Sequence, residues 1–411
     1  RLEAMGRKMK DSGIEWIGKI PMNWNVAALK YLCSMQAGKN LGSERIKNSG
    51  AYPVYGGNGL RGYYSSYLYD GDYILIGRQG ALCGNVHKVN NKVWATEHAL
   101  VTKKSKSTDL DYLYYLLLGM NLNQYASNTA AQPGLASTVI SSVKTCFPEI
   151  YEQKKIATFL DKKCASVDDV FGKTRASIEE YKKLKQAVIT EAVTKGVRGK
   201  RPMKDSGIDW VKQIPLEWQI LRGKNLFIET NEHSNSGTED LLTVSHITGV
   251  TLRSEKNVNM FLAESLVGYK ICRVGDIAAN TMWMWQGAVG VSKDYGVISP
   301  SYNTYRQIKN AYCSAYLDYL LRAKPLVETY AAYSTGITSS RLRLYPGPFL
   351  NIKFIVPPID EQKEIADYLE KKCIEIDRLI VKKEELLAEL TTCKKSLIYE
   401  YVTGKKEAPA V

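Results

Sequence analysis

The residues that most often carry chemistry in enzymes are thinly spread along this chain. The eight cysteines stand singly, without a C-x-x-C pair, and the four histidines (His87, His98, His233 and His246) form no ligand spacing. This pattern argues against a zinc site and against a disulfide framework. We therefore expect free cysteines in reducing cytosol, and histidines that pack or lie on the surface.

Two motifs that bind the cofactors of nucleic-acid enzymes are also missing. An S-adenosylmethionine-dependent DNA amino-methyltransferase carries Asn/Asp-Pro-Pro-Tyr/Phe, but the Pro-Pro pair here stands in VPPID, Val356–Asp360. GVRGKRP, Gly196–Pro202, lacks the spacing and the hydroxyl of G-x-x-x-x-G-K-[ST]. An acidic nuclease triad stays open, although solvated helix faces explain most of the acidic residues. We expect a chain that is no enzyme by itself and binds no cofactor of its own.

Polar side chains on Gly-rich loops offer a different chemistry, the reading of base edges and phosphates. In the first half the candidates are Asn58, Arg61, Arg78, Gln79, Asn85, Lys88 and Gln132. In the second half they are Ser245, Asn280, Gln286, Tyr302, Ser340, Arg341 and Arg343. The net charge of +14 and the pI of about 9.2 favour a polyanionic partner such as nucleic acid.

An internal repeat indicates the elements that carry these loops. The stretch KDSGIEWIGKIPMNW, Lys10–Trp24, returns as KDSGIDWVKQIPLEW, Lys204–Trp218, with nine of fifteen positions identical and an offset of 194 (204 − 10). Residues that read different targets should differ between the halves. We therefore expect a packing role for the four tryptophans that repeat: Trp16, Trp24, Trp210 and Trp218.

A second repeated stretch predicts two long helices. IYEQKKIATFLDKKCASVDDV, Ile150–Val170, matches IDEQKEIADYLEKKCIEIDRL, Ile359–Leu379, at eleven of twenty-one positions and an offset of 209 (359 − 150). Apolar residues then recur at heptad spacing for about four heptads. A proline before each start, and Lys195-Gly196 after the first stretch, are typical helix boundaries. At ~1.5 Å per residue, each helix would be ~60 Å long.

Two such helices would each bury an apolar stripe against the other. Antiparallel packing suits two tandem copies, because it generates a pseudo-twofold axis. Parallel packing would need a long return connection, which the intervening ~160-residue domain could supply. The parallel arrangement therefore stays open, and we favour the antiparallel coiled coil.

The stretches between the repeats, residues 40–147 and 220–356, are expected to hold short strands joined by Gly and Asn turns. Each also carries a helical patch, at residues 109–125 and 315–331. The fold class is therefore α+β, with two similar mixed α/β domains separated by two long helices packed as an antiparallel coiled coil in a pseudo-twofold internal repeat.

A marker shared by the two stretches shows how they diverge. Gly71-Asp72 … Gln79-Gly80-Ala81 returns as Gly275-Asp276 … Gln286-Gly287-Ala288. In the first copy GRQGALCG suits either a phosphate-cradling loop or a tight turn between strands. We favour the turn, because no helix start follows the loop.

Taken together and in order, the motifs resemble the specificity subunit of type I restriction–modification systems over essentially the whole chain. The resemblance rests on the fifteen-residue motif, on P-x-I-x-E-Q-K-x-I-A at each helix start, and on YGGNGLRGY … IGRQGALCGNV … WATEHALV. One departure is MWMWQGAVG in the second half, where the first has GRQGALCG, so a reading role for Arg78 does not transfer to the second half.

The resemblance implies a non-catalytic subunit whose two target-recognition domains each read one half of a bipartite double-stranded DNA site. The helices would set the spacer and dock two copies of a methyltransferase subunit, with restriction/translocase subunits in the full complex. S-adenosylmethionine, ATP and Mg²⁺ would bind those partners in a host-defence system. The alternatives are a catalytic methyltransferase or nuclease component, and a coiled-coil adaptor that binds protein.

The resemblance also implies domain boundaries. The seven expected segments are a conserved N-terminal segment (1–25), the first recognition domain (26–148), the central helix (149–196), a linker with the repeated segment (197–219), the second recognition domain (220–357), the C-terminal helix (358–404) and a tail (405–411). Residues 1–8 are expected to be a cloning scar or a tail, with Met9 as the natural start.

Overall fold

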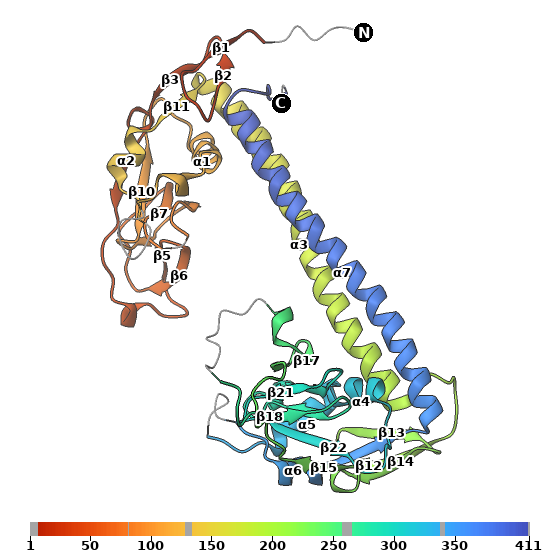
Figure 1. Cartoon of the computed structure of the whole chain (residues 1–411). Coiled ribbons are helices and arrows are strands. Elements are labelled where there is room, and N and C mark those ends of the chain that lie inside the picture. The colour runs from red at the N-terminus through yellow and green to blue at the C-terminus, as the bar shows by residue number, and fades with distance from the viewer. Residues whose placement is uncertain (1–6, 81, 128–133, 257–264, 338–341, 410–411) are drawn as a thin grey trace, which may run out of the picture. The chain divides into compact units, whose positions relative to one another are not determined.

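The computed structural model divides into two compact units, which Figure 1 shows coloured along the chain. It describes residues 7–80, 82–127, 134–256, 265–337 and 342–409. Unit 1 comprises residues 1–175 and 385–411, and unit 2 comprises residues 176–384. Each unit thus holds one copy of the fifteen-residue motif, one variable stretch and part of each long helix. The mixed α+β class is as predicted.

Unit 1 contains four small sheets among the described residues. Its strands are β1 (Met9–Asp11), β2 (Lys19–Pro21), β3 (Asn25–Ala28), β4 (Cys33–Ala37), β5 (Tyr52–Gly56), β6 (Gly59–Tyr64), β7 (Tyr73–Gly77), β8 (Val86–Val89), β9 (Trp94–Ala95), β10 (Ala99–Lys104) and β11 (Lys144–Phe147). The central antiparallel sheet has the order β4-β10-β7-β8, and β6-β5-β9 forms a second sheet. The pairs β1-β2 and β11-β3 complete the unit.

Unit 2 repeats this plan with different lengths. Its strands are β12 (Met203–Ile208), β13 (Val211–Pro215), β14 (Gln219–Arg222), β15 (Phe227–Thr230), β16 (Leu242–Ser245), β17 (Gly249–Leu252), β18 (Lys270–Cys272), β19 (Ile277–Ala279), β20 (Val289–Val291), β21 (Gly296–Ile298), β22 (Asn303–Gln307) and β23 (Lys353–Val356). The central sheet β15-β22-β19-β20 follows the same order as β4-β10-β7-β8. The pairs β12-β13 and β14-β23 match β1-β2 and β3-β11.

The helices include the two long ones at the predicted places. They are α1 (Leu110–Gly119), α2 (Ser137–Ser142), α3 (Ile150–Lys195), α4 (Ser314–Leu321), α5 (Lys324–Tyr333), α6 (Pro346–Asn351) and α7 (Ile359–Val402). Gly196 follows α3 with a φ of 77°, as expected of a glycine C-cap. None of the described helices is long and apolar enough to cross a membrane.

The α3 and α7 segments run in opposite directions within each unit, where Figure 1 draws them side by side. In unit 1, Lys394 of α7 pairs with Asp168 of α3 (Nζ–Oδ1, 2.6 Å), and Tyr401 lies 4.5 Å from Phe159 between ring centroids. In unit 2, Lys185 of α3 pairs with Asp377 of α7 (Nζ–Oδ2, 2.6 Å). Lys383 Nζ of α7 also lies 5.7 Å from the ring centroid of Tyr181 of α3 in unit 2. In both units the number falls along α7 as it rises along α3, which is antiparallel packing.

The two predicted helical patches are each broken into two pieces. Residues 109–125 form α1 and a short 3-10 helix, Leu122–Tyr125, separated by Asn121 with a φ of 47°. Residues 315–331 divide between α4 and α5, because α5 starts with Pro325 in its first turn. Proline lacks the N–H that would continue the preceding helix, so the chain turns there.

Candidate nucleic-acid interface

In unit 1, the fifteen-residue motif is attached to the long helix α3 through Trp24. Trp24 is 0 % exposed, and its Nε1 donates to Glu152 Oε2 at 3.2 Å. Arg7 donates to the other oxygen, Glu152 Oε1, at 2.5 Å. The motif is thereby bonded to the first turn of α3. Arg7 thus contacts the long helix, and the interpretation of residues 1–8 as a cloning scar or tail stays a prediction.

Unit 2 repeats the same three-residue contact. Trp218 is 0 % exposed and donates from Nε1 to Glu361 Oε2 at 3.0 Å, while Arg201 pairs with Glu361 Oε1. Trp16 and Trp210 pack partly buried against the apolar cores of units 1 and 2. The predicted packing role of the four tryptophans is therefore confirmed.

Three loops of unit 1 meet beyond the central sheet and bring several predicted reading residues together. They connect β5 to β6, β7 to β8, and β9 to β10. A Cβ built on Gly57 would lie 3.0 Å from the Gln79 carbonyl oxygen and 3.1 Å from that of His98, so the backbones are nearly in contact. GRQGALCG is the connection between two antiparallel strands, as favoured from the sequence.

Side chains in these loops hold one another by hydrogen bonds. Asn85 Nδ2 donates to Asn58 Oδ1 at 3.2 Å, and Gln79 Oε1 lies 2.6 Å from His98 Nδ1. Arg78 Nη1 lies 3.5 Å from the Glu97 carbonyl oxygen. His98 joins this cluster although it was expected only to pack or lie on the surface. Its position in WATEHALV, one of the quoted motifs, is the available sequence signal.

The remaining unit 1 candidates do not lie together. Arg61 is exposed on β6, where its Cδ lies beside Gly56. Lys88 instead pairs with Asp111 of α1 at 2.8 Å, and this hydrogen bond raises the pKa of Lys88. Nothing in the structure joins Lys88 to the loop cluster. Gln132 lies outside the described residues.

Unit 2 gathers a smaller set at the corresponding place. Asn280 Nδ2 donates to the Tyr302 hydroxyl at 2.9 Å, and Asn280 Oδ1 accepts from the Met282 backbone N–H at 3.2 Å. Thr281 Oγ1 donates to the Ser301 carbonyl at 2.9 Å. Two loops, 280–288 and 299–302, are therefore fixed together beside the ends of β19 and β22.

An aromatic pair occupies the loop where unit 1 carries Arg78. Trp283 and Trp285 stack at 6.3 Å between ring centroids, and Trp283 is 48 % exposed. Exposed Gln286 follows in the 3-10 helix Met284–Gln286. The change from GRQGALCG to MWMWQGAVG is visible in the sequence, but the exposure of Trp283 is not.

The other unit 2 candidates are not connected to this cluster by any described hydrogen bond. Ser245 accepts from the Ile247 backbone N–H at 3.1 Å, in the β16–β17 turn. Arg343 is half-buried and donates to the Leu342 carbonyl at 2.9 Å. Ser340 and Arg341 lie outside the described residues.

Several ionisable side chains near the loops are buried or ion-paired within their own unit. Asp276 is 2 % exposed and receives two hydrogen bonds from Arg306, both at 2.8 Å. Arg273 and Arg306 also bind Glu232 and lower the pKa of that carboxyl. Burial lowers the pKa of His87, which favours its neutral form. The shared Asp of the Gly-Asp marker thus bonds to Arg306 of β22 in the central sheet of unit 2.

No described group of three or more histidine, cysteine, aspartate or glutamate side chains could hold a metal ion. The eight cysteines are all free. Burial raises the pKa of Cys33, Cys146 and Cys272, each to about 12, which keeps these thiols protonated at neutral pH.

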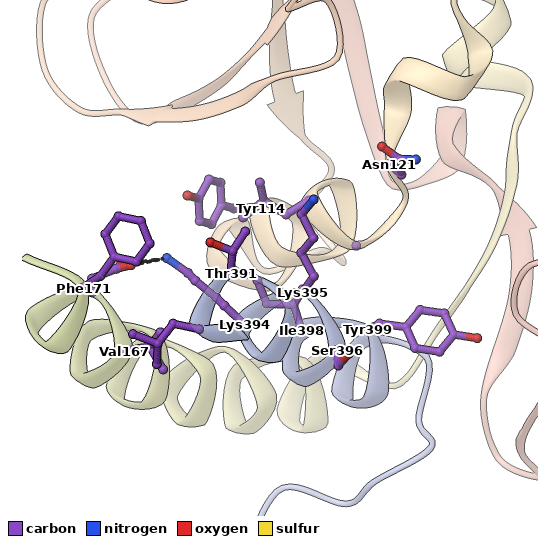
Figure 2. Close-up of a pocket in the computed structure, with 14 residues that line it drawn as sticks. Tyr114, Asn121, Val167, Phe171, Thr391, Lys394, Lys395, Ser396, Ile398 and Tyr399 are labelled. Carbon is purple, nitrogen blue, oxygen red and sulfur yellow. Dashed lines mark hydrogen bonds and ion pairs between the residues drawn. The ribbon is translucent and has the colours of Figure 1, made fainter. Parts of the chain in front are cut away.

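A groove of about 660 Å³ lies in unit 1 among α1, α3 and α7 (Figure 2). Its walls include Tyr114, Phe171 and Ile398, and Figure 2 shows the Lys394 ammonium at its edge, ion-paired with Asp168. Open apolar walls on helices suit contact with protein better than the reading of base edges. We assign the groove no cofactor.

Comparison with known proteins gives one family. Residues 21–180 match the family model described as the type I restriction modification DNA specificity domain. The EcoprrI specificity subunit of Escherichia coli is 44 % identical over 138 residues, which is 33 % of this chain and 34 % of that protein. The MjaVIII specificity subunit of Methanocaldococcus jannaschii is 23 % identical over 350 residues, 81 % of this chain and 78 % of that protein.

A solved structure supports the fold. A chain from a study of complex assembly and conformational transition in the type I restriction–modification system superposes with a TM-score of 0.68. It covers 94 % of this chain and 99 % of that one at 14 % identity, so the likeness concerns the fold.

Proposed function

We propose, from its similarity to type I restriction enzyme specificity subunits, that this chain belongs to their family and is the non-catalytic subunit that reads a bipartite DNA target. Unit 1 would read one half-site and unit 2 the other. The observation that carries this proposal is that the two units share the same supporting elements but carry different loops. The motif, sheet order and helix contacts repeat between the units, while the loop clusters differ in chemistry.

The arrangement we propose is two recognition domains separated by an antiparallel coiled coil with pseudo-twofold symmetry. The supporting contacts are the ion pairs Asp168–Lys394 and Asp377–Lys185, whose members are related by the repeat offset of 209 with the helices exchanged. The seven domain boundaries from the sequence remain a prediction.

The partners we propose are double-stranded DNA, methyltransferase subunits and restriction subunits. Two copies of the methyltransferase subunit follow from two equivalent frames, one copy at each. S-adenosylmethionine, ATP and Mg²⁺ would then bind on those partners, and the assembly would work in the prokaryotic cytosol. This placement gives the exposed helix faces a function distinct from that of the loops.

Lengthening both helices tests the proposal. Inserting one heptad after Ser177 and one after Leu386 preserves the apolar stripe and adds about 10 Å, at ~1.5 Å per residue. Since one base pair rises ~3.4 Å, the preferred spacer should grow by about three base pairs, less if the helices are tilted to the duplex. The measurement is methylation, by the complex with its methyltransferase subunits, of duplexes whose spacer varies one base pair at a time.

Inserting the heptad in α3 alone is the control, because it leaves the stripes mismatched and should reduce binding without defining a new spacer. An unchanged optimum in the folded double-insertion variant would show that the helices do not set the distance. An adaptor that binds only protein would bind no duplex, whereas a DNA reader must bind one and lose affinity steeply as salt rises.

A further inference from the structure

Two glutamines at the starts of the long helices have a geometry that the sequence motif does not explain. Gln153 of α3 is 1 % exposed and Gln362 of α7 is 0 % exposed. They are the same residue of the repeated E-Q-K motif, 209 positions apart (362 − 153). Glutamine is seldom fully buried unless its amide is hydrogen-bonded, so each needs partners.

In unit 1 the partners join the recognition domain to the helix. Gln153 Oε1 accepts from the Asp109 backbone N–H at 2.9 Å, and Nε2 donates to the Pro148 carbonyl at 2.9 Å and the Ser107 carbonyl at 3.4 Å. Asp109 is the N-cap of α1 and accepts from the Tyr112 backbone N–H at 3.0 Å. One amide therefore links the first turn of α1 to the first turn of α3.

Unit 2 contains the same link. Gln362 Oε1 accepts from the Cys313 backbone N–H at 2.9 Å, and Nε2 donates to the carbonyls of Ala311 at 2.8 Å and Pro357 at 2.9 Å. Cys313 is the N-cap of α4, which corresponds to α1. The two amides bond backbone groups at matching places although the surrounding residues differ.

A second hydrogen bond joins the same short helix, α1 or α4, to the end of the other long helix in its unit. The Tyr112 hydroxyl of α1 donates to the Val402 carbonyl at the end of α7, at 3.3 Å. The Tyr316 hydroxyl of α4 donates to the Val193 carbonyl at the end of α3, at 3.0 Å. Both tyrosines are fully buried. Within each unit, α1 or α4 is thus held to both long helices, which restricts its rotation relative to them.

We propose that Gln153 and Gln362 are positioning residues that fix the angle of each recognition domain to the helix pair, and so determine how strictly the spacer length is selected. This inference rests on the proposed function. If the domain is held rigidly to the helix pair, binding a half-site that lies one base pair too near or too far costs free energy. A joint without the amide lets the domain rotate toward such a site, while its reading loops stay unchanged.

The amide is required because it donates and accepts at once. Glutamate keeps the length and the acceptor but loses both donors, and alanine removes all of the bonds. Either change leaves buried backbone groups without partners, which is more costly than losing a bond at the surface. We therefore expect Gln153→Ala, Gln362→Ala and Gln153→Glu to act in the same direction.

The experiment compares these variants with Gln186→Ala, a matched change at an exposed glutamine of α3. The complex with its methyltransferase subunits is titrated with duplexes that keep both half-sites and vary the spacer by one base pair. The target itself is obtained first, from the methylated sites of cells carrying the system. In the variants, the preference for the optimal spacer over its neighbours should fall about two- to tenfold, the equilibrium factor of one protein hydrogen bond.

The optimum itself and the affinity for a duplex with a single half-site should stay the same, and Gln186→Ala should behave as wild type. Undiminished spacer preference in a folded variant overturns the inference. So does a loss of single-half-site affinity with the spacer preference intact, because the glutamine would then support only the domain's own fold. A wild-type complex that selects no spacer at all would instead overturn the proposed function.

Hydrogen exchange supplies a readout that needs no DNA target. The Asp109 amide should exchange faster in Gln153→Ala, and the Cys313 amide faster in Gln362→Ala, each without change in the other unit. Protection of these amides that is equal to wild type would show that the glutamines do not hold the joint.

Discussion

In unit 1 the long helices are joined by Asp168 and Lys394, and in unit 2 by Asp377 and Lys185. The same exchange occurs at Tyr112–Val402 and Tyr316–Val193. Each unit is therefore built from the domain and helix start of one repeat and the helix end of the other. Such exchange is what two copies of one sequence produce when their helices pack antiparallel.

The loops do not share this equivalence. Unit 1 carries two hydrogen-bonded pairs, Asn58 with Asn85 and Gln79 with His98, whereas unit 2 carries the stacked pair Trp283 and Trp285 at the matching connection. Polar amides distinguish bases by hydrogen bonds, while aromatic rings offer stacking or contact with a thymine methyl. The difference teaches that the supporting elements repeat because each loop set needs the same attachment to the helices, while the loops differ, as the proposed reading of two different half-sites requires.

The largest expected effect concerns Glu152 and Glu361, the two carboxylates that accept hydrogen bonds from the buried tryptophans of the repeated motif. The Glu361 side chain is 0 % exposed and that of Glu152 is 19 % exposed. Glu361→Ala removes the carboxylate partner of Arg201 and leaves the buried Trp218 N–H without its acceptor, so unit 2 should lose about 3–5 kcal/mol of stability. Glu152→Ala should cost unit 1 less, about 1–3 kcal/mol. Urea unfolding followed by hydrogen exchange in each unit measures both.

Glu180→Ala, an exposed carboxylate of α3, serves as the control and should change stability by less than about 0.5 kcal/mol. Equal losses for Glu152 and Glu361 would break the argument that burial, rather than the motif itself, sets the cost.

The middle effect concerns two glutamines at one place in the repeated marker. Gln79 and Gln286 are both exposed, and each precedes a glycine with positive φ, 92° at Gly80 and 90° at Gly287. Gln79→Ala should weaken discrimination at one position of the half-site read by unit 1 by about 1–3 kcal/mol. Gln286→Ala should act only on the other half-site. Competition binding with single-base variants of each half-site makes the comparison.

A change in the wrong half-site would reject the assignment of one unit to each half. Uniform weakening over all sequences, with a smaller salt slope, would indicate a phosphate contact in place of base reading.

The smallest effect concerns the matched ion pairs. Both are partly exposed, so Lys394→Ala and Lys185→Ala should each cost only about 0.2–1 kcal/mol. Double-mutant cycles with Asp168→Ala and Asp377→Ala should return similar coupling energies and lose them in high salt. Couplings of opposite sign would show that the two pairs are not equivalent.

The sequence by itself was sufficient to predict the elements that repeat between the units, namely the two long helices and the buried tryptophans of the fifteen-residue motif. Heptad spacing, prolines and Lys195-Gly196 predicted α3 and α7 closely, and repetition correctly assigned Trp24 and Trp218 to packing. These features were readable because helix periodicity and capping are local, and because two copies of one motif supply their own comparison.

The tertiary structure decided which distant residues meet. Lys88 pairs with Asp111 of α1, and partly exposed His98 lies against Gln79; neither contact follows from the sequence pattern around these residues. Arg7, expected in a tail, binds Glu152 across 145 positions. Loop contacts depend on sheet order and on the packing of strands far apart in sequence, which no local pattern records. The candidate residue types were therefore visible in the sequence, but which of them lie together within each unit was set by the fold.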